Sequence, residues 1–311
     1  MKFGLRYCNT GRFIDSAHAV ELIVAAEEAG FDSAWTVEHT VIPELHASKY
    51  PYSKDGRMAG DRYDLPLPDP LIWMAYVAAH TTRIKLGTGI LILPQHNPVV
   101  VAKQIATLDL MSGSRVLLGI GVGWMREEFQ VLGLPPFEER GAVTDEYIRA
   151  FKELWTEDDP HFEGKYISFD DISFLPKPVQ KPHPPILIGG SSVAARQRVA
   201  RFGDGWHTLR QTPRQFAKGR ADIFERTEIA GRDASALRFS LSIPIRFTDT
   251  PPSAPVMDRT ALTGTNDDIA ETINAYKIVG LDEIVLGISS AEMNLNIKTM
   301  ERFMHDVVPR L

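Results

Sequence analysis

Apolar residues in this chain follow two alternating patterns. Short runs of mostly apolar residues are each followed by a longer segment in which apolar residues recur every three or four positions. The first pattern is typical of a strand buried on both faces, and the second of a helix with one apolar face. The expected strands are residues 3–7, 33–37, 83–93, 116–118, 186–188, 205–207, 237–247 and 283–286.

Residues that start and stop helices stand between these strands. Ser16 is expected to cap a helix that Gly30 ends, and Asn97 precedes a proline at the favoured first helical position. Asp267 or Asp268 is expected to start the helix before the last strand. The other expected helices run from the cap Asp69 to residue 80 and over residues 98–111, 125–131, 144–155, 193–202, 213–229 and 294–307.

About eight strands, each followed by a helix, favour a single (βα)8 barrel of the triosephosphate isomerase type over residues 1–311. Two insertions interrupt the alternation. Residues 40–69 follow the second strand and are of the kind that acts as a lid or binding loop. Residues 160–185, which begin like a hairpin and end rich in proline, precede the fifth strand. A doubly wound open sheet is the alternative, although no GxGxxG motif follows the first strand.

Composition limits the partners that the protein can have. A net charge of -6 and a pI near 5.9 leave no basic excess for nucleic acid or an anionic membrane. No segment approaches the roughly 20 apolar residues of a membrane helix, so a cytoplasmic protein is expected. Cys8 is the only cysteine, which fits a reducing compartment. We expect Cys8 to be a small core residue, and a reactive thiol is the alternative.

In a barrel of this type, functional residues lie at the C-terminal ends of the strands. The residues expected there are rich in glycine, hydroxyl groups and histidine, whereas the strands that lead to them are apolar. Such a mouth fits a flat ligand with polar edges that lies on backbone and places a phosphate near a helix start. The positions at this end are 7–10, 38–39, 87–90, 95–96, 121–124, 189–192, 207–208, 246 and 287–289.

Two glycine-rich turns are candidates for contact with a ligand. Residues 119–123 (Gly-Ile-Gly-Val-Gly) lead from the fourth strand into a helix, so their peptide N–H groups can approach an anion or cofactor. A tight connection without a ligand is the alternative. Residues 189–192 (Gly-Gly-Ser-Ser) are the stronger phosphate candidate, because serine hydroxyls add donors at a helix start. Ordinary capping of that helix by Ser191 or Ser192 is the alternative.

His39 directly follows the second strand and precedes the long insertion. A neutral imidazole at that place can donate to, or accept from, a substrate or a cofactor ring, and a structurally bonded histidine is the alternative. Glu38, His39, His46 and His96 could instead bind a metal ion, but no HxH or HExxH spacing supports this. We therefore expect no metal site.

Four segments carry a family resemblance, namely GIGVGWMREEF, LGLPPFEERG, FEGKYISFDDISFLPKPVQKPHPPILIGGSS and ARFGDGWH. Together they resemble the bacterial luciferase-like monooxygenase superfamily, and most closely its branch that uses the deazaflavin coenzyme F420. The likeness covers most of residues 1–300. It implies a (βα)8 barrel, usually dimeric, that holds the deazaflavin or a flavin such as FMN in its mouth.

The resemblance also implies roles for single residues. His39 matches a histidine that contacts the ring region, and Gly89-Ile90 matches a bulge with a non-prolyl cis peptide behind the ring. The expected catalytic residues are Glu38, His39 and Trp124. The expected cofactor-binding residues are His39, Thr88, Gly89, Ile90, Gly121, Val122, Gly123, Gly189, Gly190, Ser191 and Ser192.

Trp124 departs from one group of relatives. The F420-dependent glucose-6-phosphate dehydrogenases that this branch includes carry a carboxylic acid after the strand-four glycines, and tryptophan cannot donate a proton as that acid can. Sugar-phosphate oxidation is therefore not expected, and a small apolar substrate stacked on Trp124 fits better. Simple packing of the loop is the alternative interpretation of Trp124.

Three functions remain open at this point. The first is hydride transfer between the deazaflavin and a carbon of a small substrate, with His39 as acid or base. The second is an FMN-dependent monooxygenase that needs a reductase partner. The third is a flavin-binding barrel without turnover, against which the long insertion argues, because it is suited to close over a substrate.

Overall fold

A computed structural model describes residues 1–58, 63–288, 290 and 292–311. Its central feature is a closed ring of eight parallel strands, because β10 pairs with β9 on one side and with β12 on the other. This confirms the (βα)8 barrel. The strands are β1 (Lys2–Arg6), β2 (Ser33–Thr36), β3 (Lys85–Thr88), β5 (Val116–Gly121), β8 (Ile186–Gly189), β9 (Gly205–Leu209), β10 (Arg238–Phe247) and β12 (Glu283–Gly287).

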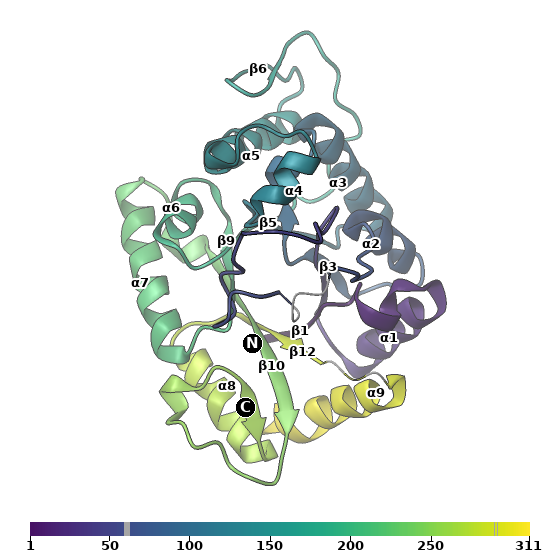
Figure 1. The fold of residues 1–311 in the computed structure, drawn as a ribbon, viewed down its shortest axis with the longest axis vertical. Coiled ribbons are helices and arrows are strands. Elements are labelled where there is room, and N and C mark those ends of the chain that lie inside the picture. The colour runs from purple at the N-terminus through teal and green to yellow at the C-terminus, as the bar shows by residue number, and fades with distance from the viewer. Residues whose placement is uncertain (59–62, 289, 291) are drawn as a thin grey trace.

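Helices surround this ring (Figure 1). They are α1 (Ser16–Ala29), α2 (Pro70–Ala78), α3 (Pro98–Ser112), α4 (Arg126–Val131), α5 (Arg140–Thr156), α6 (Val193–Phe202), α7 (Pro213–Ile229), α8 (Asn266–Ile278) and α9 (Met293–Arg302). No helix of the described ranges has the length and apolar character that a bilayer crossing requires.

Two helix starts differ from the expected ones. The N-cap of α1 is Asp15 and not Ser16, because the Asp15 carboxylate accepts from the His18 amide. The N-cap of α8 is Thr265, whose side chain and that of Asp268 accept from each other's backbone amides. This reciprocal pair starts the helix before Asp267. The expected caps Asn97 and Asp69 are confirmed for α3 and α2.

The expected third strand, residues 83–93, is split in two. β3 is followed by a cis peptide between Gly89 and Ile90, and the chain then resumes as β4 (Leu91–Ile92), which pairs with β5. The cis bond that the family resemblance implied is therefore confirmed. A continuous strand was the wrong expectation, because an apolar run alone does not reveal a bulge within it.

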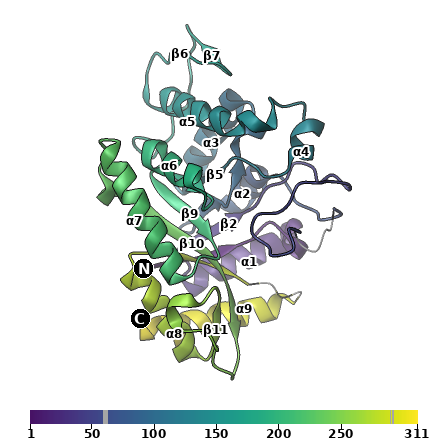
Figure 2. The ribbon, with the colours of Figure 1, turned by 60° about the vertical axis from the view of Figure 1, so that its left-hand side comes forward.

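The two insertions have different structures. The hairpin before the fifth strand is confirmed as β6 (Phe162–Glu163) paired antiparallel with β7 (Ser168–Phe169), and it projects beyond α5 (Figure 2). Within the described residues, the segment between β2 and α2 contains neither helix nor strand. β11 (Leu262–Gly264), which pairs with the end of β10, was not expected.

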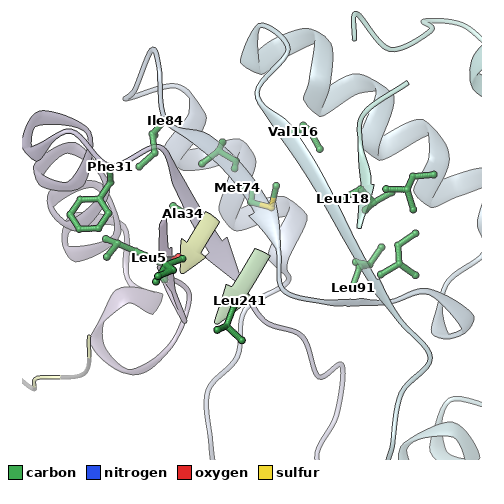
Figure 3. Close-up of a cluster of buried hydrophobic side chains, with 14 of the residues drawn as sticks. Leu5, Phe31, Ala34, Met74, Ile84, Leu91, Val116, Leu118 and Leu241 are labelled. Atoms are coloured by element: carbon green, nitrogen blue, oxygen red, sulfur yellow. Dashed lines mark hydrogen bonds between the residues drawn. The ribbon is translucent and has the colours of Figure 1, made fainter. Parts of the chain in front are cut away.

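Alternate residues of each strand point outward into an apolar layer between barrel and helices. Leu5, Ala34, Leu118 and Leu241 are fully buried members of this layer, and Figure 3 shows them with Met74 of α2. Burial of a leucine or methionine side chain contributes about 2 kcal/mol, so this layer is the main source of stability.

Cys8 lies in the same apolar layer and is only 1% exposed. Burial raises the pKa of the Cys8 thiol to about 12, so the thiol stays protonated at neutral pH. The core role expected for this residue is confirmed.

The other strand residues point into the barrel. Trp35, Leu117, Leu187 and Val285 form a separate apolar cluster there. Towards the N-terminal ends of the strands, the Trp35 indole donates to the Ser33 hydroxyl (2.7 Å), which donates to the Glu283 carboxylate. Burial raises the pKa of Glu283 to about 7.

The raised pKa of Glu283 makes stability depend on pH. The carboxyl of Glu283 has an ordinary pKa of 4.5 and a folded-state pKa of about 7. Its contribution is therefore complete below pH 4.5 and is lost as the pH rises through about 7. We expect the free energy of unfolding of the wild type, relative to Glu283→Gln, to fall by up to roughly 3 kcal/mol across this range.

Urea unfolding of both proteins at several pH values measures this difference. Glu225→Gln, on the exposed face of α7, serves as a matched control with no expected effect of this kind. Parallel pH profiles for the wild type and Glu283→Gln would contradict the assignment.

Candidate active site

One side of the barrel mouth, which we call the glycine side, consists of three features. They are the last inward-facing positions of β5 and β8 and the bulge after β3. Its residues are Gly89, Gly121 and Gly189, with the side chain of Ile90 lying over them. A Cβ atom at Gly121 would lie 2.4 Å from Ile90 Cδ1, and one at Gly189 would lie 2.6 Å from Ile90 Cγ2. These two positions therefore require glycine because Ile90 occupies the space above them, a reason that differs from the expected close approach of a cofactor.

Two other residues that were predicted to bind the cofactor, Thr88 and Gly123, have structural roles. The Thr88 hydroxyl is buried and donates to the Gly119 carbonyl (2.8 Å), so it ties β3 to β5. Gly123 has φ 79°, and a Cβ there would lie 2.8 Å from the Phe129 ring. Val122 is half-buried.

The turn after β8 is held from two sides. The Trp206 indole donates to the Gly190 carbonyl (2.6 Å), and the Ser192 hydroxyl accepts from the Ala195 amide (3.1 Å) at the start of α6. Ordinary N-capping by Ser192 is therefore present. Ser191 is half-buried beside it. The Tyr52 hydroxyl of the insertion lies 3.5 Å from where a Cβ of Gly190 would stand.

His39 is bonded to a buried carboxylate on α4. Its Nδ1 lies 3.0 Å from Glu128 Oε2, and the two side chains are 8% and 1% exposed. Glu128 Oε1 also accepts from the amides of Thr40 (2.9 Å) and Val41 (3.3 Å). Because Nδ1–H donates to this carboxylate, Nε2 is the nitrogen left to accept or donate a proton.

Glu38 faces a different partner from its neighbour His39. One of its oxygens accepts from the Ile92 amide (2.5 Å), and the other lies 2.8 Å from His96 Nε2. Burial acts to lower the pKa of His96. The hydrogen bond from His96 to Glu38 and the attraction between the two groups outweigh burial, so the pKa of His96 is raised. Glu38 thus fixes the turn behind the bulge, and its predicted catalytic role stays a prediction.

Trp124 is the centre of an aromatic cluster that holds the insertion. The rings of His39 and His46 each stand edge-on with centroids 5.9 Å away, and that of Tyr50 stands at 5.2 Å. Glu127 Oε1 also accepts hydrogen bonds from the backbone amides of Ala47 (2.8 Å) and Ser48 (3.2 Å) in the insertion. The insertion therefore lies across the mouth beside α4 (Figure 1).

The candidate metal ligands do not meet. His46 Nδ1 lies 3.0 Å from the Ser48 carbonyl, while His39 and His96 each have their own carboxylate. Among the residues that the structure describes, no group of three or more His, Cys, Asp or Glu side chains could hold a metal ion. The expected position Ser289 lies outside the described residues.

His207 is a site residue to which the sequence assigned no role. Its ring stacks on Trp35, with centroids 4.5 Å apart, and its Nδ1 lies 2.8 Å from the Ser240 hydroxyl. Its Nε2 lies 3.2 Å from where a Cβ of Gly89 would stand. Burial lowers the pKa of His207 to about 4, so a neutral imidazole lies beneath the bulge. In the sequence, the only sign of a role for His207 was its position at the end of a strand.

Comparison with known proteins shows the family to which the chain belongs. The sequence profile described as luciferase-like monooxygenase matches residues 8–255. The chain belongs to this family. Luciferase-like enzymes are oxidoreductases, and both F420-dependent and FMN-dependent members are among the relatives of this chain.

Three luciferase-like relatives illustrate this range. A Mycobacterium tuberculosis protein without an assigned function is 37% identical over 215 residues, 69% of this chain and 73% of the relative. An F420-dependent glucose-6-phosphate dehydrogenase of Amycolatopsis mediterranei is 36% identical over 60% of this chain and 51% of its own. An FMNH2-dependent dimethylsulfone monooxygenase of Pseudomonas putida is 36% identical over 57% of this chain and 50% of its own.

A solved luciferase-like structure extends the match to the full chain. The monooxygenase RslO1 of Streptomyces bottropensis is 25% identical, has a TM-score of 0.79, and aligns over 99% of both chains. The likeness in fold thus extends over the whole chain, beyond the residues that the sequence profile matches.

The bonds of Glu128 generate a prediction about the insertion. Glu128→Ala removes the acceptor of the Thr40 and Val41 amides, whereas Glu128→Gln keeps a carbonyl oxygen there. We expect hydrogen exchange at these amides to become about tenfold faster or more in Glu128→Ala, since a hydrogen bond to a charged group contributes about 1.5–3 kcal/mol. Glu128→Gln should exchange more slowly than Glu128→Ala, and equal exchange in wild type and Glu128→Ala would rule the contact out.

Proposed function

We propose that this luciferase-like enzyme is an F420-dependent oxidoreductase that transfers a hydride between the deazaflavin and a small organic substrate. The observation that carries the proposal is the pairing of His39 Nδ1 with the buried carboxylate of Glu128, in a ring that stands edge-on to Trp124. The 36% identity to an F420-dependent dehydrogenase supports the choice of cofactor.

The residues at the mouth fit a flat cofactor with a phosphate. Ile90 is a half-buried apolar surface over the glycine side, and the backbone amides of Gly190 and Ser191 and the first turn of α6 are suited to a phosphate. Tyr52 covers Gly190 and has to move aside. When bound, the deazaflavin supplies the carbon that accepts or releases the hydride.

His39 has the acid or base role in this proposal. When a substrate hydroxyl is oxidised, Nε2 takes its proton, and in the reverse direction Nε2 returns it. Glu128 keeps the proton of Nδ1 on the other side of the ring and stabilises the imidazolium that forms. Trp124 and Tyr50 cover this side of the mouth and limit the access of water.

An FMN-dependent monooxygenase is the second candidate. The identity to an FMNH2-dependent monooxygenase is also 36%, and such an enzyme would need a reductase partner to supply reduced flavin. The same glycine side and the same turn before α6 would then hold FMN.

Cofactor titration together with one variant tests the proposal. We expect the wild type to bind deazaflavin more tightly than FMN, and His39→Ala to keep this affinity while turnover falls by about 100-fold or more. His305→Ala, at an exposed position near the C-terminus, is the matched control. Binding of FMN without deazaflavin would favour the monooxygenase, and full turnover by His39→Ala would remove the role of that residue.

We also propose that the protein is a homodimer. Ile72 and Tyr76 on α2 and Val100 on the adjacent α3 are large apolar side chains with exposed fractions of 71%, 45% and 55%. A second copy of this face would cover them. We expect Ile72→Glu to shift the mass in light scattering from dimer towards monomer, with Ile229→Glu on α7 as control; a monomeric wild type would refute the dimer.

A further inference from the structure

The side of the mouth opposite the glycine side carries a buried positive charge. Arg6, at the end of β1, is only 7% exposed and points into the barrel. Its Nη1 donates to the Ser242 hydroxyl of β10 (3.2 Å), and its guanidinium lies 4.4 Å from the centre of the Tyr7 ring. Its Nε is buried without a hydrogen-bond partner in the described part of the chain.

The surroundings of Arg6 contain cations and phenols. Burial is the main cause that lowers the pKa of Arg6, and Tyr7, Arg210 and Tyr50 act on it as well. Arg6 in turn acts on His207. Arginine nevertheless stays protonated at neutral pH. Within the described residues no carboxylate pairs with Arg6, and an unpaired buried charge costs several kcal/mol. The site therefore lacks the anion that this cation would normally have.

Gly287 of β12 lets the guanidinium lie across the strand. A Cβ atom there would stand 2.4 Å from Arg6 Nε and 2.9 Å from Nη2. Any larger residue at this position would push the guanidinium away from Ser242. The cation is thus built into the barrel by three strands, β1, β10 and β12.

Two hollows lie beside the strand ends around this arginine, although Arg6 itself is not among their described lining residues. The larger, about 680 Å3, is lined by Gly287 and Ile288 together with the cations Arg246, Lys298 and Arg302. The smaller, about 430 Å3, is lined by Tyr7, Arg12 and Ile288. Among the described lining residues of both hollows there is no aspartate or glutamate. This part of the mouth is basic although the whole chain has a charge of -6.

We propose that the substrate carries a carboxylate, which Arg6 binds at the mouth, where β1, β10 and β12 end. The planar guanidinium suits a planar carboxylate, and the surrounding cations raise the local concentration of anions. The residues suited to the cofactor lie on β3, β5 and β8, across the mouth, so the carboxylate belongs to the substrate. That this ligand is a substrate rests on the proposed function. Trp124 then contacts the apolar part of this substrate. The sequence led us to expect an apolar substrate, and Arg6 adds that this substrate carries an acid group.

Benzoate and benzamide form a matched pair of probes, since they differ chiefly in charge. Calorimetric titration of the full chain with each probe measures the preference for the carboxylate without any turnover. We expect the wild type to bind benzoate about tenfold or more tightly than benzamide, as for a charge-assisted hydrogen-bonded pair. Similar affinities for the two probes, or no binding of either, would overturn the proposal.

Variants of Arg6 assign the preference to this residue. Arg6→Met should abolish the preference for benzoate over benzamide, and Arg6→Lys should retain part of it. Arg201→Met, on the exposed face of α6, should leave this preference unchanged. Circular dichroism reports whether Arg6→Met is folded, and its deazaflavin binding reports whether the anion belongs to the cofactor instead. Loss of deazaflavin affinity in folded Arg6→Met, or an unchanged benzoate preference, would refute a substrate carboxylate at Arg6. A wild type that prefers benzoate but binds no deazaflavin would instead refute only the choice of cofactor.

Discussion

The indole of Trp35 occupies the centre of the barrel, and much of the site depends on the space that it takes. A Cβ at Gly87 would lie 2.6 Å from this ring, and one at Gly4 would lie 3.0 Å from its nitrogen. Glycine at position 87 lets β3 pass this close to the ring, while Leu117, Leu187 and Val285 of other strands pack in the same cluster. Trp35 also supports the flat face of His207, which lies beneath the Gly89 bulge. A side chain packed for stability therefore sets the floor of the mouth.

Above this floor, α4 connects the barrel to the insertion. Glu127 and Glu128, in the first turn of α4, accept hydrogen bonds from backbone amides of the insertion, and Glu128 also holds His39. Acidic residues are common at this place in a helix because they complement its dipole. Here the same residues orient the candidate acid or base and hold the insertion across the mouth. Closure of the mouth and orientation of His39 are thus physically coupled.

The two sides of the mouth differ in the kind of ligand that they suit. The glycine side offers Ile90 and exposed backbone, which suit a flat ring and its phosphate. The opposite side offers Arg6 and the cations around the larger hollow, which suit an anion. A bimolecular oxidoreductase needs both ligands in one cavity in a fixed relative position. The proposed division of the mouth would supply such an arrangement.

The alternation of apolar runs and helical periods determined the barrel, because each element encodes its own period and its own caps. The same local signals placed His39, Trp124 and the glycine turns at strand ends, and the family motifs pointed to the bulge at Gly89. Only the tertiary structure paired His39 with Glu128, 89 residues away. It also laid Ile90 over two distant glycines and, among the described residues, gave Arg6 no carboxylate partner. Such contacts join separate strands and loops, and local sequence patterns do not record which side chains meet across the barrel.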